Sequence, residues 1–145
     1  MDNQHFVDEI DSIRDTDPRY ELDAYVFVCE ALQYTSRMLD KPRSGPDRHV
    51  SPIELLEGIR KYALQEFGPM ARTVFGTWGI TRTGDFGNVV FNMIDREIFG
   101  KTGTDKPEDF ADGYAFEDAF TKPYLPTGRP GPQRSTRPGG RPRLP

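Results

Sequence analysis

The chain has 145 residues, of which 35% are hydrophobic, and it carries one cysteine and a formal net charge of −4. This length suits one domain of ordinary size, and a single cysteine excludes both an internal disulfide and a cysteine-based zinc site. The start of the chain lacks a secretory signal, and no run approaches the roughly 20 apolar residues that span a bilayer. We therefore expect a cytoplasmic protein without a membrane partner.

Two helices are predicted first. Residues 3–14 carry apolar side chains at helical spacing with acidic residues on the other side, which predicts a short amphipathic helix. Asp17 followed by Pro18 reads as an N-cap and the first position of a second helix over residues 18–39. That second segment is apolar on nearly all sides, so we expect it in the middle of a helical bundle.

Residues 40–49 contain two prolines, a glycine and five charged residues, which predicts a surface loop. The next helix has the clearest start signal of the chain. Ser51 and Glu54 have the spacing of a capping box, in which each side chain accepts from the other residue's backbone N–H. Gly68 ends the helix predicted over residues 51–67.

Two further helices are expected over residues 69–78 and 85–98. Gly79 is a suitable left-handed end for the first of them. Thr83 or Asp85 would cap the second.

The pattern of residues 98–117 leaves two structures open. Residues 98–102 and 113–116 could pair as a small β-hairpin, or residues 107–120 could form short helical turns. In both cases four aromatic side chains are expected to pack on the core: Phe110, Tyr114, Phe116 and Phe120. We predict a mainly α, single compact domain of about five helices over residues 1–120, with a winged-helix-like arrangement as the alternative.

Charge divides the chain at residue 121. Residues 1–120 hold 13 Lys and Arg against 23 Asp and Glu, a balance of −10, whereas residues 121–145 hold six cations and no acid, a balance of +6. Seven prolines, four glycines and five arginines fill this last part, so it buries too little apolar surface to offset the entropy of ordering. A disordered Arg/Pro/Gly-rich tail over residues 121–145 is predicted.

Residues that could carry catalysis are sparse. His5 and His49 lie in polar segments without a second ligand at metal-binding spacing, and Cys29 lies among apolar residues that raise a thiol's pKa. Gly100, Lys101 and Thr102 spell the end of a phosphate-binding loop but follow a predicted helix and lack its first glycine. We therefore predict no metal site, no small-molecule cofactor and no enzymatic activity, and a small enzyme is the least favoured reading.

Helices 69–78 and 85–98 have the order of a helix-turn-helix motif. The face that would read DNA bases carries Asp85, Asn88, Asn92, Asp95 and Arg96. This face is net acidic where phosphates must approach, which disfavours DNA binding.

Several short motifs resemble a family of small proteins from Planctomycetes and Verrucomicrobia bacteria. They are, in chain order, His49-Val50-Ser51, Glu54 to Gly58, Phe67-Gly68, Trp78-Gly79-Ile80, Thr83, Asp85-Phe86-Gly87 and Asp109-Phe110. The resemblance spans about residues 3–120, so the basic tail lies outside it. No activity is assigned to that family, so the resemblance implies a bacterial cytoplasmic origin and no site residues.

The sequence predicts a macromolecular partner, reached in one of two ways. In the first, the tail binds RNA, the ribosome or another polyanion through Arg129, Arg134, Arg137, Arg141 and Arg143. In the second, the helical body is a protein–protein interaction module with an apolar groove near Trp78, Ile80, Thr83 and Asp85. Both are binding or adaptor functions of a non-enzymatic protein.

Overall fold

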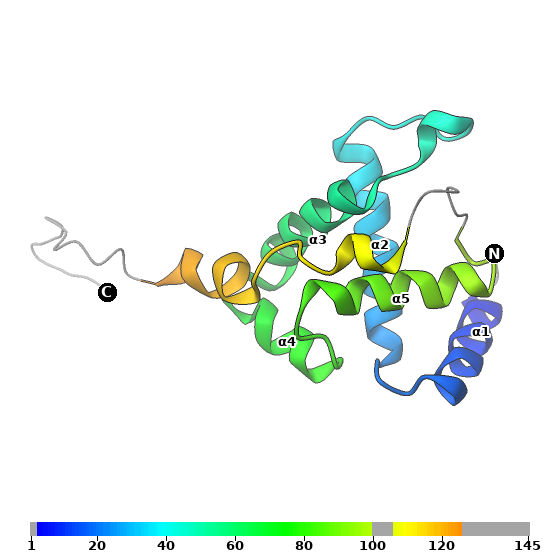
Figure 1. The fold of residues 1–145 in the computed structure, drawn as a ribbon, viewed down its shortest axis with the longest axis horizontal. Helices are drawn as coiled ribbons and strands as arrows, with labels where there is room; N and C mark the ends of the chain where they lie inside the picture. The colour runs from blue at the N-terminus through cyan, green and yellow to red at the C-terminus, as the bar shows by residue number, and fades with distance from the viewer. Residues whose placement is uncertain (1–2, 100–105, 126–145) are drawn as a thin grey trace, which may run out of the picture.

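The computed structural model describes residues 3–99 and 106–125. Within these ranges the chain forms five α-helices and no β-strand (Figure 1). The helices are α1 (Asn3–Thr16), α2 (Leu22–Met38), α3 (Pro52–Phe67), α4 (Ala71–Thr77) and α5 (Thr83–Asp95). The predicted mainly α-helical domain is therefore confirmed.

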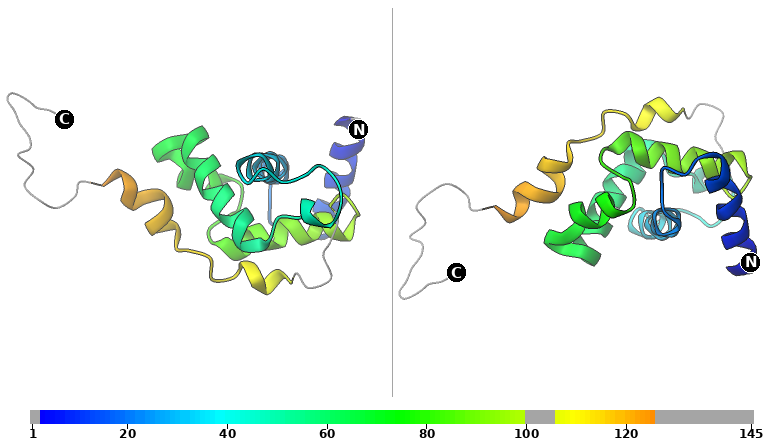
Figure 2. Two further views of the ribbon diagram at one scale, coloured as in Figure 1. Left: turned by 90° about the horizontal axis from the view of Figure 1, so that it is seen from above. Right: turned by 90° about the horizontal axis from the view of Figure 1, so that it is seen from below.

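Helix α2 lies at the centre of the fold. It packs against α1, α3 and α5, as its apolar sequence on nearly all sides predicts. Helix α5 runs across α2 rather than along it, and α1 lies beside the last turns of α5 (Figures 1 and 2). Short helical turns after α5 cover the outer side of α5 and continue toward α4.

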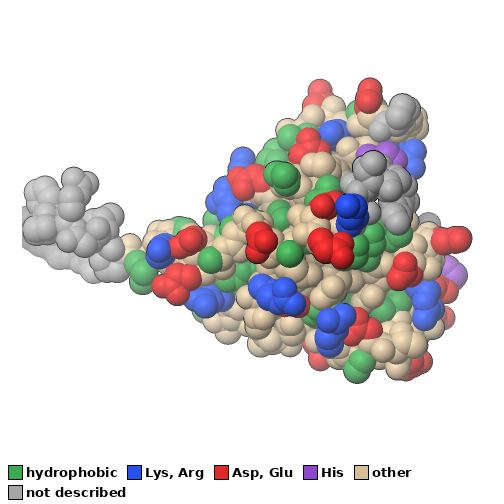
Figure 3. Space-filling view, in the orientation of Figure 1, with side chains coloured by type: hydrophobic (Ala, Val, Ile, Leu, Met, Phe, Trp, Pro, Cys, Tyr) green, Lys and Arg blue, Asp and Glu red, His purple; other side chains and the backbone are tan. Residues whose placement is uncertain are grey.

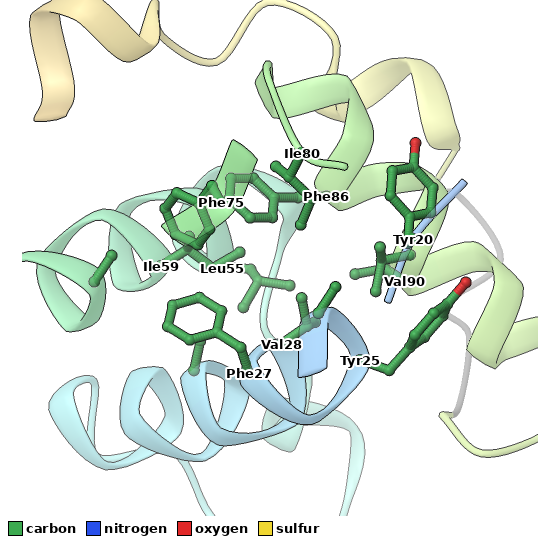
Figure 4. Packing of buried hydrophobic residues seen from close by; sticks show 14 of the residues in the cluster. Tyr20, Tyr25, Phe27, Val28, Leu55, Ile59, Phe75, Ile80, Phe86 and Val90 are labelled. Carbon is green, nitrogen blue, oxygen red and sulfur yellow. The ribbon is translucent and has the colours of Figure 1, made fainter. Parts of the chain in front are cut away.

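Aromatic rings form the middle of the core, where Phe75 of α4 is fully buried. Its ring lies 5.2 to 6.3 Å, between centroids, from six other rings. They come from α2, α3, α5, the residue after α4 and the turn at residues 116–121: Phe27, Phe67, Trp78, Phe86, Phe116 and Phe120. Figure 4 shows aliphatic side chains of α2, α3 and α5 beside Phe27, Phe75 and Phe86, so the core connects these helices with α4.

The predicted start of α3 and the predicted glycine ends are confirmed. Glu54 donates its backbone N–H to Ser51 Oγ at 3.1 Å, and Ser51 donates its own N–H to Glu54 Oε1 at 2.9 Å. Gly68 has φ +53° and Gly79 has φ +88°, both in the region that disfavours side chains. At Gly79 a Cβ atom would also collide with the carbonyl oxygen of Arg19.

The predicted start of the second helix is wrong by four residues, because α2 begins at Leu22 and not at Pro18. Asp17 does not cap a helix. Its carboxylate accepts 2.7 Å hydrogen bonds from Nε and Nη2 of Arg19 and a 3.0 Å bond from Asn92 of α5. Tertiary contacts therefore replace the expected cap and keep residues 17–21 as a connector.

The hairpin predicted within residues 98–117 is also wrong for the residues described there, and the alternative of short helical turns is confirmed. Residues Pro107–Phe110 form a 3₁₀ turn and Glu117–Thr121 a π-helical turn. Residues 100–102 of the predicted hairpin lie outside the described residues. Three of the four aromatic residues expected on the core, Phe110, Phe116 and Phe120, are buried, and Tyr114 packs against it.

The helical body extends past the predicted boundary at residue 121. Lys122–Tyr124 forms a further 3₁₀ turn, and Arg72 of α4 donates to the Thr121 hydroxyl at 3.1 Å. The body therefore reaches at least Leu125, the last residue described before the tail.

Candidate functional site

The tail residues predicted to bind a polyanion, Arg129, Arg134, Arg137, Arg141 and Arg143, lie outside the described residues. The chain reaches the last described residue, Leu125, at the end of the domain opposite residues 40–50 (Figures 1 and 2).

Three of the four residues predicted to contact a protein partner lie in the interior. Ile80 and Thr83 are each 1% exposed and Asp85 is 7% exposed, while Trp78 is half-buried in the ring cluster. Asp85 accepts hydrogen bonds from the Tyr20 hydroxyl at 2.6 Å and from the Thr81 backbone N–H at 2.9 Å. These residues form the core and the start of α5, so the prediction that they form an exposed apolar groove is wrong.

The polar face of α5 is also occupied within the molecule. Asn88 donates to the Tyr20 hydroxyl at 2.9 Å, Asn92 donates to the Tyr25 hydroxyl at 3.1 Å, and Arg96 donates to Ser12 Oγ at 2.6 Å. This face is therefore turned toward α1 and α2. It is not free to enter a DNA groove, and the described residues contain no strand that could serve as a wing.

A groove of about 840 Å³ opens on the other side of the domain. It lies between the C-terminal half of α2, the connector 40–50, the start of α3 and the C-terminal half of α5 with Ile98 and Phe99. Its volume is in the range of ligand-binding cavities. We call this site the basic groove, for the charges along its rim.

The floor of the basic groove is apolar. Leu55, Val90 and Phe110 are buried beneath it. Six further apolar residues line it, pack against the core on one side and remain partly exposed on the other: Leu32, Val50, Phe91, Ile94, Ile98 and Phe99. These side chains give the basic groove an apolar surface beneath the charged groups of its rim.

The rim carries four cations, Arg37, Lys41, Arg43 and Arg48, and one carboxylate, Asp40. Lys41 pairs with Glu54 at 3.3 Å. Within the part of the chain that the structure describes, the three arginines make no ion pair. Figure 3 shows basic and histidine side chains in the region of residues 40–50, with acidic side chains nearby.

His49 is half-buried and lines the basic groove, although its sequence segment is polar. His5 is exposed in the first turn of α1. The two imidazoles thus belong to different parts of the domain, and the described residues contain no group of three or more His, Cys, Asp or Glu arranged to hold a metal ion.

The lone cysteine does not resemble a nucleophile. Burial raises the pKa of Cys29 to about 12, so the thiol is protonated at neutral pH. Its Sγ lies 3.8 Å from Sδ of Met93 on α5, in a contact between two core helices. Cys29 therefore serves packing, as its apolar neighbours in the sequence predict.

Sequence reasoning missed the basic groove, although one signal was present. Residues 41–48 hold three cations against one acid in a body with an excess of ten acids. This segment reads as an ordinary loop until the fold brings Ile94 and Phe99 beside it.

No protein family, no curated protein and no solved structure matches the chain. No helix in residues 3–99 and 106–125 combines the length and apolar character that a bilayer crossing requires.

Proposed function

We propose that this is a non-enzymatic binding protein that holds an acidic, partly apolar segment of another protein in the basic groove. One observation carries the proposal. An apolar floor that includes Ile94 and Phe99 lies beside Arg37, Arg43 and Arg48, which have no ion-pair partner among the described residues. A partner with both apolar side chains and carboxylates would satisfy both parts of the site.

The spread of the cations favours a protein segment over a small amphiphile such as a fatty acid. Arg37 lies in the last turn of α2, and Arg43 and Arg48 lie in the connector that follows. A fatty acid has one carboxylate, whose single negative charge cannot balance three arginines. A peptide with several acids can reach all of them while its apolar side chains cover the floor.

The charge sign excludes the protein's own tail as the favoured occupant. Residues 121–145 hold six cations and no acid, so they would meet the arginines of the rim with like charge. An acidic partner is the complementary choice.

A direct test uses a fluorescein-labelled synthetic peptide of about 18 residues, long enough for five helical turns, with Leu at i, i+3, i+4 and i+7 and Glu at the remaining exposed positions. We expect fluorescence anisotropy to report binding that weakens with added salt. The Arg37→Glu/Arg43→Glu/Arg48→Glu variant should bind roughly tenfold to a hundredfold more weakly, since three exposed pairs of up to about 1 kcal/mol each sum to at most about 3 kcal/mol.

The matched control makes the same change in net charge away from the basic groove, in the variant Lys61→Glu/Arg72→Glu/Lys122→Glu. These cations are exposed and pair with Glu57, Glu117 and Asp118. The control should bind the peptide nearly as well as the wild type does. Equal weakening in both variants, or equal binding of a peptide whose leucines are replaced by serine, would mean nonspecific charge attraction and would contradict the proposal.

A second candidate function is favoured by the separation of charge along the chain. The tail could bind RNA, the ribosome or another polyanion through its five arginines, whose forked guanidinium groups suit phosphates. A chain ending at Leu125 should then lose co-sedimentation with ribosomal RNA at low salt. If the truncated chain sediments with RNA as well as the full chain does, the tail is not the binding element.

A further inference from the structure

The elements that line the basic groove restrict the conformation of the partner segment bound there. This inference rests on the proposed function. Its lining residues lie in α2, α3, α5 and the connectors between helices, and none lies in a strand. An extended peptide gains affinity by adding a strand to an exposed sheet edge, because its backbone hydrogen-bonds along that edge. The basic groove offers no such edge, so an extended peptide would leave its backbone groups to water.

A polyproline II ligand is a poor match for a different reason. Such ligands are rich in proline and dock in grooves lined by aromatic side chains. Most apolar side chains of the basic groove are aliphatic, and of its three phenylalanines, Phe91, Phe99 and Phe110, the last is buried. Its rim is cationic, so the arginines that often accompany proline-rich segments would be repelled.

The floor instead carries side chains at the spacing that forms ridges on a helix. On α5, Val90 and Ile94 are four residues apart and line the basic groove with Phe91 between them. On α2, Leu32 and Ser36 have the same spacing. Side chains at this spacing form ridges on a helix, and another helix packs between such ridges with its residues at i, i+3, i+4 and i+7.

The volume of the basic groove fits the side chains on one face of a helix and is too small to enclose a whole helix. About 840 Å³ is the size of a site for a drug-sized ligand, which corresponds to a few large side chains. The rest of the bound helix would stay at the rim. Its flanking positions would then face the long side chains of Arg37, Arg43 and Arg48, which are exposed.

From these observations we infer that the basic groove binds its partner as an amphipathic α-helix, with large apolar residues on the inserted face and Asp or Glu on the flanks.

The test compares three versions of the labelled leucine and glutamate peptide on the full chain: unconstrained, held helical by a hydrocarbon cross-link between two solvent-facing positions, and broken by two central prolines. Preorganising a ligand in its bound form strengthens binding. We expect the cross-linked peptide to bind about tenfold more tightly than the unconstrained one, and the proline peptide at least about tenfold more weakly. Circular dichroism should show a gain of helix when the unconstrained peptide binds.

The outcomes separate this inference from the function beneath it. If the proline peptide binds as tightly as the cross-linked one and the Arg37→Glu/Arg43→Glu/Arg48→Glu variant loses both, the basic groove binds an extended segment. The helical inference is then overturned while the proposed function stands. If no version binds, or if the arginine variant binds all three unchanged, the proposed function fails together with the inference.

Discussion

Two carboxylates, Asp85 within α5 and Asp17 in the connector before α2, hold the polar face of α5 to the rest of the domain. Asp85 accepts from the Tyr20 hydroxyl at 2.6 Å, and Asp17 accepts from both Arg19 and Asn92. Burial, followed by the hydrogen bond to Asp85, raises the pKa of Tyr20 to about 12. The hydrogen bonds from Arg19 hold the pKa of Asp17 well below its usual value of 3.8. These two sites fix the connector 17–21 against α5.

Asp17 gives the domain a predictable sensitivity to acid. A carboxyl group whose folded pKa lies below its unfolded pKa stabilises the fold fully above the unfolded value and loses that effect as pH falls below it. The free energy of unfolding of the wild type should therefore fall as pH is lowered from about 4 toward 2. In Asp17→Asn this fall should be shallower, as measured by urea unfolding at each pH.

Asp15→Asn is the matched control for this experiment. Asp15 is exposed near the end of α1 and makes no ion pair with any described residue. Its replacement should leave the pH dependence close to that of the wild type. If Asp17→Asn follows the wild-type curve as well, the contact with Arg19 does not contribute to stability.

At the scale of elements, α2 and α3 cross at a close distance where α3 carries a glycine. A Cβ atom built on Gly58 of α3 would collide with the side chain of Thr35 on α2, whose hydroxyl donates to the Ala31 carbonyl at 2.7 Å. Both residues are buried. The two backbones can approach this closely only because α3 lacks a side chain at the crossing.

Gly58→Ala should therefore lower the free energy of unfolding by about 1 to 3 kcal/mol, the usual cost of overpacking a core. Gly76→Ala is the control, because a Cβ atom at Gly76 in α4 would meet nothing within 4 Å. Alanine lowers the backbone entropy of the unfolded chain, so Gly76→Ala should be neutral or should stabilise the fold by up to about 1 kcal/mol. Urea unfolding would measure both, and a loss at Gly76 equal to that at Gly58 would contradict the crossing argument.

Local signals in the sequence predicted most helices well. Ser51 with Glu54, and Gly79, act on backbone groups a few residues away, so their effects can be predicted without knowing the fold. Asp17 failed as a cap because its carboxylate accepts from the Arg19 side chain, two residues along, and from Asn92, far along the chain. Tertiary hydrogen bonds of this kind leave no periodic trace in the sequence.

The candidate site was much harder to predict than the helices. Leu32 and Ile94 each belong to a helix with an apolar face, and nothing local separates a buried position on that face from a half-buried one. Both residues are partly exposed because they line the groove that α2, α5 and the connector 40–50 enclose in the folded domain. Conversely, Ile80 reads as a surface residue in a turn, yet tertiary packing leaves it 1% exposed.

At the scale of the whole molecule, the C-terminal turns complete the core. Phe116 and Phe120, at 4% and 1% exposure, pack against Phe75. Past Phe120, Tyr124 and Leu125 are 46% and 50% exposed. The hydrophobic core of the described chain therefore ends at Phe120, and the turn Lys122–Tyr124 adds only surface contacts.

Truncated chains should show that the hydrophobic core ends at Phe120. A chain ending at Leu125 should unfold at the same urea concentration as the full chain, because it keeps every core residue described here. A chain ending at residue 115 loses two buried aromatic side chains, each worth about 3 to 5 kcal/mol, and should be largely unfolded. Circular dichroism with urea would distinguish them, and a native-like transition in the shorter chain would mean that the C-terminal turns are dispensable.

The position of Trp78 has a practical consequence. It is the chain's single tryptophan, and its ring centroid lies 5.6 to 5.9 Å from those of Phe27, Phe67 and Phe75. It does not line the basic groove. The emission maximum of Trp78 should therefore shift to longer wavelength when the domain unfolds. Its wavelength should stay unchanged when a ligand binds in the basic groove. One optical signal can thus separate global unfolding from binding without any added dye.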